Sequence, residues 1–318
     1  MPLRISQTKA ISRTKKKSGT TWKKILSSYD LYLLLLPVLA HYIIFCYVPM
    51  YGVQIAFRRY SVANGIWGSE WVGLLHFQRF FSSYYFKRLL GNTLGISLYS
   101  IALSFPLPIL LALMLNEVRS AGFKKFVQTV TYAPHFLSTV VIVGMLTSFL
   151  SPSMGIVNKL IGVFGHEPIY FMAEAKWYKT VYVLSGAWQS TGWGAIIYMA
   201  ALAGIDVELY EAATIDGASR FRQCLYITIP LLMPTAVILL ILNCGKIMSI
   251  GFEKSYLMQN DLNLKASDVI ATYVYRKGLL DAEYSFSTAV GIFNSVVNLI
   301  LLTVVNSISR KLGEVSLW

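Results

Sequence analysis

Six stretches of the chain are apolar for roughly twenty residues or more, and the only charged residue inside them is Lys246. The stretches cover residues 31–50, 93–116, 127–150, 181–204, 231–251 and 287–308. A helix of about 20 apolar residues crosses the hydrocarbon core of a bilayer. Such a helix also satisfies its own backbone hydrogen bonds, which lipid cannot do. The pattern therefore predicts an all-α, polytopic integral membrane protein with about six transmembrane helices.

The composition indicates the same class of protein. Of the 318 residues, 55% are hydrophobic and only 14% are charged, and the mean hydropathy is +0.56. Soluble domains carry about 25% charged residues, so the composition excludes an ordinary soluble protein of this length. The first apolar stretch is long for a secretory signal, and no small-residue cleavage site follows it. We interpret it as an uncleaved first span.

The positive charge is concentrated at the beginning of the chain. The net charge is +13, and eight of the 28 Lys and Arg residues precede position 25, before the first acidic residue, Asp30. A basic run before an apolar span is typical of the cytoplasmic face, where it meets anionic lipid headgroups. The alternative is an arm that binds nucleic acid. The first interpretation, together with six spans, places both termini in the cytoplasm.

A second concentration of one residue type is aromatic and lies between the first two spans. Trp67, Trp71 and several Phe and Tyr residues fall within residues 67–86. Aromatic residues at this position are most often anchors at the membrane interface. The alternative is a surface that binds an external protein.

The sequence lacks the motifs that catalysis or metal binding requires. Gly245-Lys246 has neither the preceding Gly nor the following Ser or Thr of a phosphate-binding loop. The Cys and His residues are scattered without metal-ligand spacing: they are Cys46, Cys224, Cys244, His41, His76, His135 and His166. We therefore expect no catalytic residue, no metal site and no cofactor bound by this chain.

The segment between the fourth and fifth stretches predicts an ordered inner loop. Asp206 can cap the N-terminus of a short helix, and Glu208 and Glu211 suit its positive end. Gly217 permits the left-handed turn that ends this helix. A second short helix follows, with an apolar stripe at Phe221, Leu225 and Ile229. Such a loop suits docking into a groove of another protein, and the alternative is a helix lying on the membrane surface.

This loop resembles the signature of permease subunits of ATP-binding-cassette importers. The signature has Glu-Ala-Ala, three residues, Gly, nine residues and Ile-x-Leu-Pro, with one departure here, since Ile replaces Leu. The matching residues are Glu211, Ala212, Ala213, Gly217, Ile227, Ile229 and Pro230. The resemblance extends to Phe252-Glu253-Lys254, to residues 256–258 and 268–275, and to the ending 307–318. These segments are similar to the carbohydrate-uptake branch, and most similar to permeases for pectin- and alginate-type oligosaccharides.

The resemblance implies a type I importer permease fold in the bacterial cytoplasmic membrane. The implied partners are a paralogous second permease, two ATPase subunits that hold ATP and Mg, and an extracellular or periplasmic solute-binding protein that delivers the oligosaccharide. The implied domains are a cytoplasmic tail (1–28), a transmembrane domain (29–310) with a coupling loop (205–230), and a C-terminal tail (311–318). The residues implied in coupling to the ATPase are Glu211, Ala212, Ala213, Asp216 and Gly217.

Polar residues inside the spans are candidates for the translocation path, because polar groups in lipid usually face a cavity or the bundle interior. The candidates are Trp188, Gln189, Trp193, Asn243, Lys246, Asn294 and Asn298. Amides and aromatic rings suit a sugar, and the alternative is polar contact between helices. A continuous fifth helix would place Asn243, Lys246 and Glu253 on one face. Lys246 then needs a partner, either a carboxylate such as Glu253 or one from the partner permease, or a uronate group of the substrate.

Two other classes of function compete with an ATP-driven importer. An ion-gradient-driven secondary sugar transporter predicts inverted repeats and broken helices, which the sequence does not display. A membrane-embedded enzyme would need clustered acids or histidines inside the spans, and these are absent from the six stretches. Both features favour the importer permease.

Overall fold

The computed structural model describes residues 28–313 and 316–317. Apart from Ser28, the predicted N-terminal tail (1–28) lies outside the described residues, as do three positions of the predicted C-terminal tail, 314, 315 and 318. The chain divides into two compact units, one ending at Gln54 and one from Ile55 onward. Each unit is described by itself.

The first unit is a single apolar helical segment. It consists of α2 (Tyr29–Tyr42), a π-helical turn η1 (Ile43–Tyr47), α3 (Val48–Met50) and the beginning of the 3₁₀ helix η2 (Tyr51–Phe57). Pro37 lies inside α2, and no residue of α2, η1 or α3 is buried. A helix that is apolar all round is typical of a membrane span. Its length and composition suffice to cross a bilayer, as predicted for the first stretch.

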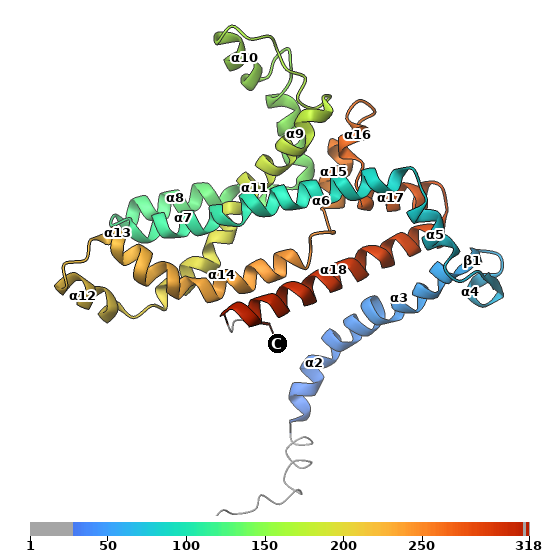
Figure 1. The fold of residues 1–318 in the computed structure, drawn as a ribbon, viewed down its shortest axis with the longest axis horizontal. Coiled ribbons are helices and arrows are strands. Elements are labelled where there is room, and N and C mark those ends of the chain that lie inside the picture. The colour runs from blue at the N-terminus through green and yellow to red at the C-terminus, as the bar shows by residue number, and fades with distance from the viewer. Residues whose placement is uncertain (1–27, 314–315, 318) are drawn as a thin grey trace, which may run out of the picture. The chain divides into compact units, whose positions relative to one another are not determined.

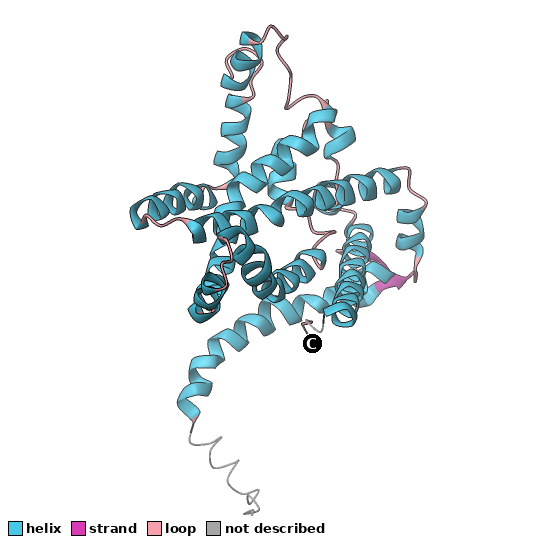
Figure 2. Cartoon of the chain, turned by 60° about the vertical axis from the view of Figure 1, so that its left-hand side comes forward, coloured by secondary structure: helices cyan, strands magenta, loops and turns pink. Residues whose placement is uncertain are grey.

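The second unit begins with a small hairpin. Strands β1 (Arg58–Ser61) and β2 (Ser69–Trp71) pair antiparallel, with Arg58 opposite Trp71. The short helix α4 (Gly65–Gly68) connects them, and α5 (Leu75–Phe81) follows. Within the described residues, strands are confined to this hairpin (Figure 2). Trp67 is 73% exposed, whereas Phe80 is buried, so only some of the aromatic residues of this segment lie at the surface.

The remaining elements of the second unit are helical. In chain order they are α6 (Tyr85–Ser104), α7 (Pro106–Glu117), α8 (Ala121–Tyr132), η3 (Ala133–Phe136), α9 (Thr139–Phe149), α10 (Ile156–Val163), α11 (Ala175–Ala203), α12 (Val207–Ile215), α13 (Arg220–Gln223), η4 (Cys224–Thr228), α14 (Ile229–Cys244), α15 (Phe252–Met258), α16 (Leu264–Ser267), α17 (Ile270–Tyr275), η5 (Arg276–Leu280) and α18 (Tyr284–Gly313). In this unit, α12 and α13 lie at one end, and β1, α4 and α5 lie at the opposite end (Figure 1).

Four helices of the described residues are long and apolar enough to cross a membrane, and two bent helix pairs would raise the number to six. The span predicted over residues 127–150 is not one straight helix, because α8 with η3 and α9 meet at an angle of 102°. The bend has a local cause. Pro134 lies in the 3₁₀ turn, and the Ser138 hydroxyl accepts a hydrogen bond from the Val141 amide, which starts a new helix.

The fifth span differs from the prediction at both ends. At its start, α13, η4 and α14 form one continuous helical segment from Arg220. The π-helical turn η4 joins α13 to α14, so the predicted second short helix is not separate from the span, and Phe221 of its apolar stripe is exposed. At its end, α14 stops at Cys244 rather than near residue 251. There a Cβ on Gly245 would lie 2.7 Å from Leu302 Cδ1, so α14 and α18 approach closely.

The long helix α11 packs against five other α-helices, α6, α7, α8, α14 and α16. Its closest approach is to α8, where a Cβ on Gly192 would overlap the Thr131 carbonyl. Two buried clusters include α11 side chains, one around Tyr178 and Val183 and one around Ala195 and Tyr198. These two clusters pack α11 against the neighbouring helices, several of which carry candidate functional residues.

Candidate functional site

The segment 205–230 has the first short helix that the sequence predicts. The Asp206 carboxylate caps α12 by accepting a hydrogen bond from the Glu208 amide at 3.0 Å. No residue of α12 is buried, and the Ile215 side chain is 87% exposed. Glu211 and Ala212 are exposed as well, and Ala213 is partly covered. The helix therefore presents a small surface of mixed acidic and apolar character.

Gly217 ends α12 in the manner predicted. Its φ is +74°, a left-handed conformation that strains any residue with a Cβ. The Ala218 amide donates to the Ala213 carbonyl at 2.9 Å, and the Gly217 amide donates to Thr214 at 3.1 Å. This pair of hydrogen bonds is the Schellman motif. Asp216 is the C-cap residue and is exposed.

Side chains on both sides of the turn fix the orientation of α12. The Tyr210 hydroxyl lies 3.0 Å from the hydroxyl of Thr228, a buried residue just before α14. The Gln223 amide donates to the Thr214 hydroxyl at 2.9 Å. An exposed ion pair of 3.3 Å joins Arg220 to Glu117 at the end of α7. Helix α12 is consequently joined to the segment that leads into α14, and α13 contacts the end of α7.

A groove with both polar and apolar lining residues runs along α6, α11 and α14. It consists of two adjoining cavities of about 310 and 220 Å³. Both cavities are lined by Ser100, Ile101 and Asn243. Trp193 lines the first cavity and Lys246 lines the second. The structure therefore brings together three of the seven candidate path residues, with serine hydroxyls of α6 beside them.

Lys246 reaches this groove from a turn rather than from a helix. Because α14 ends at Cys244 and α15 begins at Phe252, the predicted single face with Asn243 and Glu253 does not form. No carboxylate of the described residues lies within ion-pair distance of Lys246, so the predicted intrachain pair with Glu253 is absent there. The Lys246 side chain is exposed in this chain.

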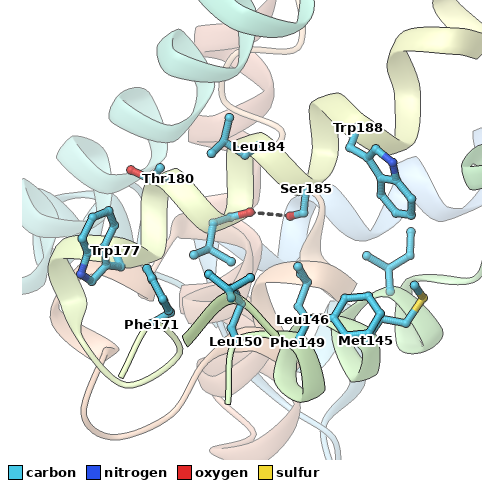
Figure 3. A pocket seen from close by; sticks show the side chains of 13 residues that line it. Met145, Leu146, Phe149, Leu150, Phe171, Trp177, Thr180, Leu184, Ser185 and Trp188 are labelled. Carbon is cyan, nitrogen blue, oxygen red and sulfur yellow. Dashed lines mark hydrogen bonds between the residues drawn. The ribbon is translucent and has the colours of Figure 1, made fainter. Parts of the chain in front are cut away.

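Two candidates on α11 lie away from the groove. Trp188 lines a cavity of about 450 Å³ between α9 and α11, whose walls are almost entirely apolar (Figure 3). The Gln189 amide donates to the Leu137 carbonyl at 3.2 Å, at the bend before α9. Trp193 is held by stacking on His135, with ring centroids 4.6 Å apart. Trp193 alone of the three lines the groove.

The two asparagines of α18 do not line the groove either. The Asn298 side chain accepts a hydrogen bond from the Met248 amide and donates one to the Ser249 hydroxyl, both at 2.9 Å. Asn298 therefore fixes the turn that carries Lys246. The Asn294 Oδ1 atom is buried and has no hydrogen-bond partner in the described part of the chain.

Sequence reasoning missed a buried charge cluster at the end of the unit opposite α12. The Asp268 side chain is fully buried and accepts from Arg88 Nη2 at 2.8 Å and from Arg276 Nη2 at 3.0 Å. The Asn92 amide donates to the carbonyls of Lys265 and Asp268. The position of Arg88 at the start of α6 could have indicated this cluster, because a cation beside a membrane span needs a partner of opposite charge. Its partner is far away in sequence.

A second charge cluster lies nearby. Glu283 is 2.6 Å from Arg79 and 3.3 Å from Lys277, which also contacts Asp281 at 2.8 Å. Burial acts to raise the pKa of the Glu283 carboxyl, but Arg79 and Lys277 outweigh it and hold this pKa below its usual range. The hydrogen bond to Asp281 raises the pKa of the Lys277 amine. Among the described residues, no three His, Cys, Asp or Glu side chains are placed to bind a metal.

Comparison with known proteins gives extensive matches. The family described as "Binding-protein-dependent transport system inner membrane component" matches residues 104–314. The polygalacturonan/rhamnogalacturonan transport system permease protein YteP of Bacillus subtilis (strain 168) is 44% identical, over 97% of this chain and 96% of its own length. Protein LplB of the same organism is 45% identical over 94% of this chain and 95% of its own length.

Solved structures match over a similar extent. A crystal structure of a bacterial ABC transporter involved in the import of the acidic polysaccharide alginate has a chain that is 41% identical, with a TM-score of 0.85. The match covers 92% of this chain and 99% of that one. A second structure contains the alginate transporter with an alginate pentasaccharide-bound periplasmic protein, and its matching chain has a TM-score of 0.86 at 40% identity. That match covers 93% of this chain and 99% of the other.

Proposed function

Because this chain belongs to the family of inner membrane components of binding-protein-dependent transport systems, we propose that it is the permease subunit of an ATP-driven oligosaccharide importer. The sequence prediction of an all-α, polytopic permease of the type I importer fold is confirmed by the solved alginate transporter. The chain itself is a membrane component, and ATP hydrolysis belongs to separate subunits.

The observation that carries the mechanism is the geometry of α12. The helix is exposed, capped at both ends, and joined by hydrogen bonds to the segment that begins α14. Glu211, Ala212 and Ala213 lie on it, and Asp216 and Gly217 form its end. We assign these residues the role of docking into a groove of the ATPase. ATPase closure would then move α12 and α14 as one body.

The groove along α6, α11 and α14 supports a hydrophilic substrate. Serine hydroxyls, the Asn243 amide and the Trp193 ring offer hydrogen bonds and an aromatic surface. Asn243, Lys246 and Trp193 are therefore the path residues that the geometry favours, whereas Asn298 acts by fixing the turn before α15. Two relatives are named for polygalacturonan/rhamnogalacturonan and for alginate, which suggests an acidic oligosaccharide as cargo.

The partners follow from the same assignment. A solute-binding protein on the outer side delivers the sugar, as the family description implies. We further propose a paralogous second permease that completes the path and two ATPase subunits that bind ATP and Mg. Both termini would lie in the cytoplasm, on the side of α12. The chain would then cross the bacterial inner membrane several times and bind no cofactor of its own.

The experiment is uptake by the assembled importer in proteoliposomes. We expect uptake of a labelled oligogalacturonate to require ATP on the side of the ATPases and the binding protein on the other side. Dissipating ion gradients with an ionophore should leave the uptake rate unchanged. Uptake that continues without ATP and stops with the ionophore would instead establish an ion-gradient-driven secondary transporter. The copurifying subunits identify the partner proteins directly.

A further inference from the structure

We propose that a second polar cavity, at the end of the unit opposite α12, binds the carboxylate-bearing oligosaccharide before it enters the groove. This inference rests on the proposed function and specifies where the substrate is first held by this chain. The cavity has a volume of about 700 Å³, within the range of pockets that hold small ligands. Its walls come from the first turns of α6, from α15 and the segment after it, and from α17 and η5. We call it the entry cavity.

One wall of the entry cavity carries an excess of positive charge. Arg88 and Arg276 both line it, and both contact the single carboxylate of Asp268, which is fully buried. Two guanidinium groups share one carboxylate, so one positive charge is not balanced within this cluster. The ion pairs use only the Nη2 atom of each arginine, and Arg88 Nε is buried with no partner in the described chain. A planar guanidinium recognises a carboxylate through paired hydrogen bonds.

The arginine wall is held in place before any ligand arrives. The Asn92 amide donates to the Asp268 carbonyl at 3.1 Å, and the Thr272 hydroxyl donates to the Asp268 carboxylate at 3.4 Å. The Arg88 guanidinium also lies over the ring of Tyr85, 5.0 Å from its centroid. Groups that are fixed in this way lose little conformational entropy when a ligand binds.

Aromatic rings and amides complete the entry cavity. Tyr85 and Tyr256 line it and are 40% and 44% exposed. The Tyr256 ring is fixed by stacking on Phe252, with centroids 5.4 Å apart. Gln259 and Asn260 add amide groups to the same cavity. Rings with a polar edge, amides and a cationic wall together match the hydroxyls, ring faces and carboxylates of a uronic acid oligosaccharide.

The charges on the remaining wall explain why the carboxylate would point toward the arginines. Lys277 also lines the cavity, but Asp281 and Glu283 lie 2.8 and 3.3 Å from its amine and neutralise it. The exposed Asp261 adds a negative charge to the same lining. Helix α6 runs from the entry cavity to the groove, because Ser100, which lines the groove, lies twelve residues after Arg88, which lines the entry cavity. That separation is about 18 Å along the helix axis. The entry cavity and the groove share no lining residue, so they can be tested separately.

The first test measures binding in the assembled importer without the binding protein. The variant Leu257→Cys places a thiol on the cavity wall at a partly exposed position, in a background where Cys46, Cys224 and Cys244 are changed to serine. We expect an oligogalacturonate to slow maleimide labelling of this thiol, and the neutral oligogalactoside of equal length to protect it far less. Tyr84→Cys, which is exposed and does not line the cavity, serves as the unprotected control.

The second test removes one guanidinium group. Arg88→Gln leaves Asp268 paired with Arg276 through both carboxylate oxygens, so the buried acid keeps a partner. We expect it to raise the oligogalacturonate concentration needed for half protection by about tenfold, the loss expected for a charge-assisted pair. Arg79→Gln, which breaks an ion pair at the same end but does not line the cavity, should leave that concentration unchanged. Tyr256→Ala provides an independent variant that leaves all charges in place.

The proposal that the entry cavity binds the oligosaccharide would be refuted by equal protection from both sugars or by no protection from either. It would also be refuted if Arg88→Gln left the concentration for half protection unchanged. The proposed function is judged by a different readout, ATP-dependent uptake. An importer that transports the oligosaccharide without protecting Leu257→Cys would retain its function and refute this site. A protected thiol in a complex that does not couple uptake to ATP would support the site and refute the function.

Discussion

Asp268 and Arg88 lie 180 positions apart in sequence, and their side chains meet at 2.8 Å with the carboxylate fully buried. The contact joins the segment between α14 and α18 to the first turns of α6. Arg276 contacts both carboxylate oxygens at 3.0 Å, so one buried acid organises two cations. A buried carboxylate in such a position is costly to disturb, because each partner left alone is a desolvated charge.

We expect Asp268→Asn to destabilise the protein by about 3–5 kcal/mol, because Arg88 and Arg276 lose their common counter-charge. The measurement is thermal unfolding of the purified importer complex in detergent. Asp261→Asn, an exposed acid of the same segment, is the matched control and should change the unfolding temperature little. Equal stability of Asp268→Asn and the wild type would mean that the cluster does not anchor the segment.

At Gly217, replacement by leucine should abolish substrate-stimulated ATP hydrolysis. A residue with a Cβ is strained by about 1–2 kcal/mol at the observed φ of +74° and would distort the Schellman turn. Gly122→Leu is the control, because its Cβ meets no atom within 4 Å and its φ is not left-handed. ATPase rates and membrane insertion are measured for both variants. Normal transport by Gly217→Leu would refute the coupling role.

Lys246→Gln separates a substrate contact from a structural charge. If Lys246 meets the cargo in the groove, uptake of an acidic oligosaccharide should fall about tenfold or more, with uptake of a neutral one nearly unchanged. Lys159→Gln, on α10 and away from the groove, controls for the lost charge. Equal losses for both sugars, accompanied by a less stable complex, would assign Lys246 to an ion pair with a partner subunit.

Glu283 should make stability depend on acidity. Its pKa in the folded protein is below the ordinary value of 4.5, because Arg79 and Lys277 outweigh the effect of burial. The resulting stabilisation is fully present above that ordinary value and is lost as pH falls through the lowered pKa. We therefore expect Glu283→Gln to be less stable than the wild type at neutral pH, with the difference disappearing in acid. Unfolding temperatures across the acid range test this expectation, with the exposed Glu70→Gln as control.

The fold class could be predicted because apolar stretches long enough to cross a bilayer are a property of the local sequence. The direction of each helix could not. Hydropathy does not register that Ser138 caps a new helix after the Pro134 turn. At the early end of α14, Gly245 lies close to Leu302, which is remote in sequence. The bend therefore arises from a local turn and helix cap, whereas the end of α14 lies at a contact between distant residues, and hydropathy reports neither.

The candidate site divides in the same way. The caps at Asp206 and Gly217 were predicted because a helix end is encoded by a few consecutive residues. Asn298 was expected in the path on grounds of polarity, but its partners, Met248 and Ser249, belong to a turn that the sequence pattern had placed inside a helix. The roles proposed for the path residues stay predictions. The hydrogen-bond partners of these polar residues could not be predicted, because they are distant in sequence.

The contact between Gly192 and Thr131 also has a consequence for how this protein can vary. At this position, any side chain would overlap the backbone of the neighbouring helix, so even alanine demands a shift of α8 against α11. Gly91 and Gly162 have open space where a Cβ would go. Lineages that diverge from this sequence should hence change those two positions freely and keep glycine at 192. A complete mutational scan would record position 192 as intolerant, although the residue has no side chain to contribute to transport.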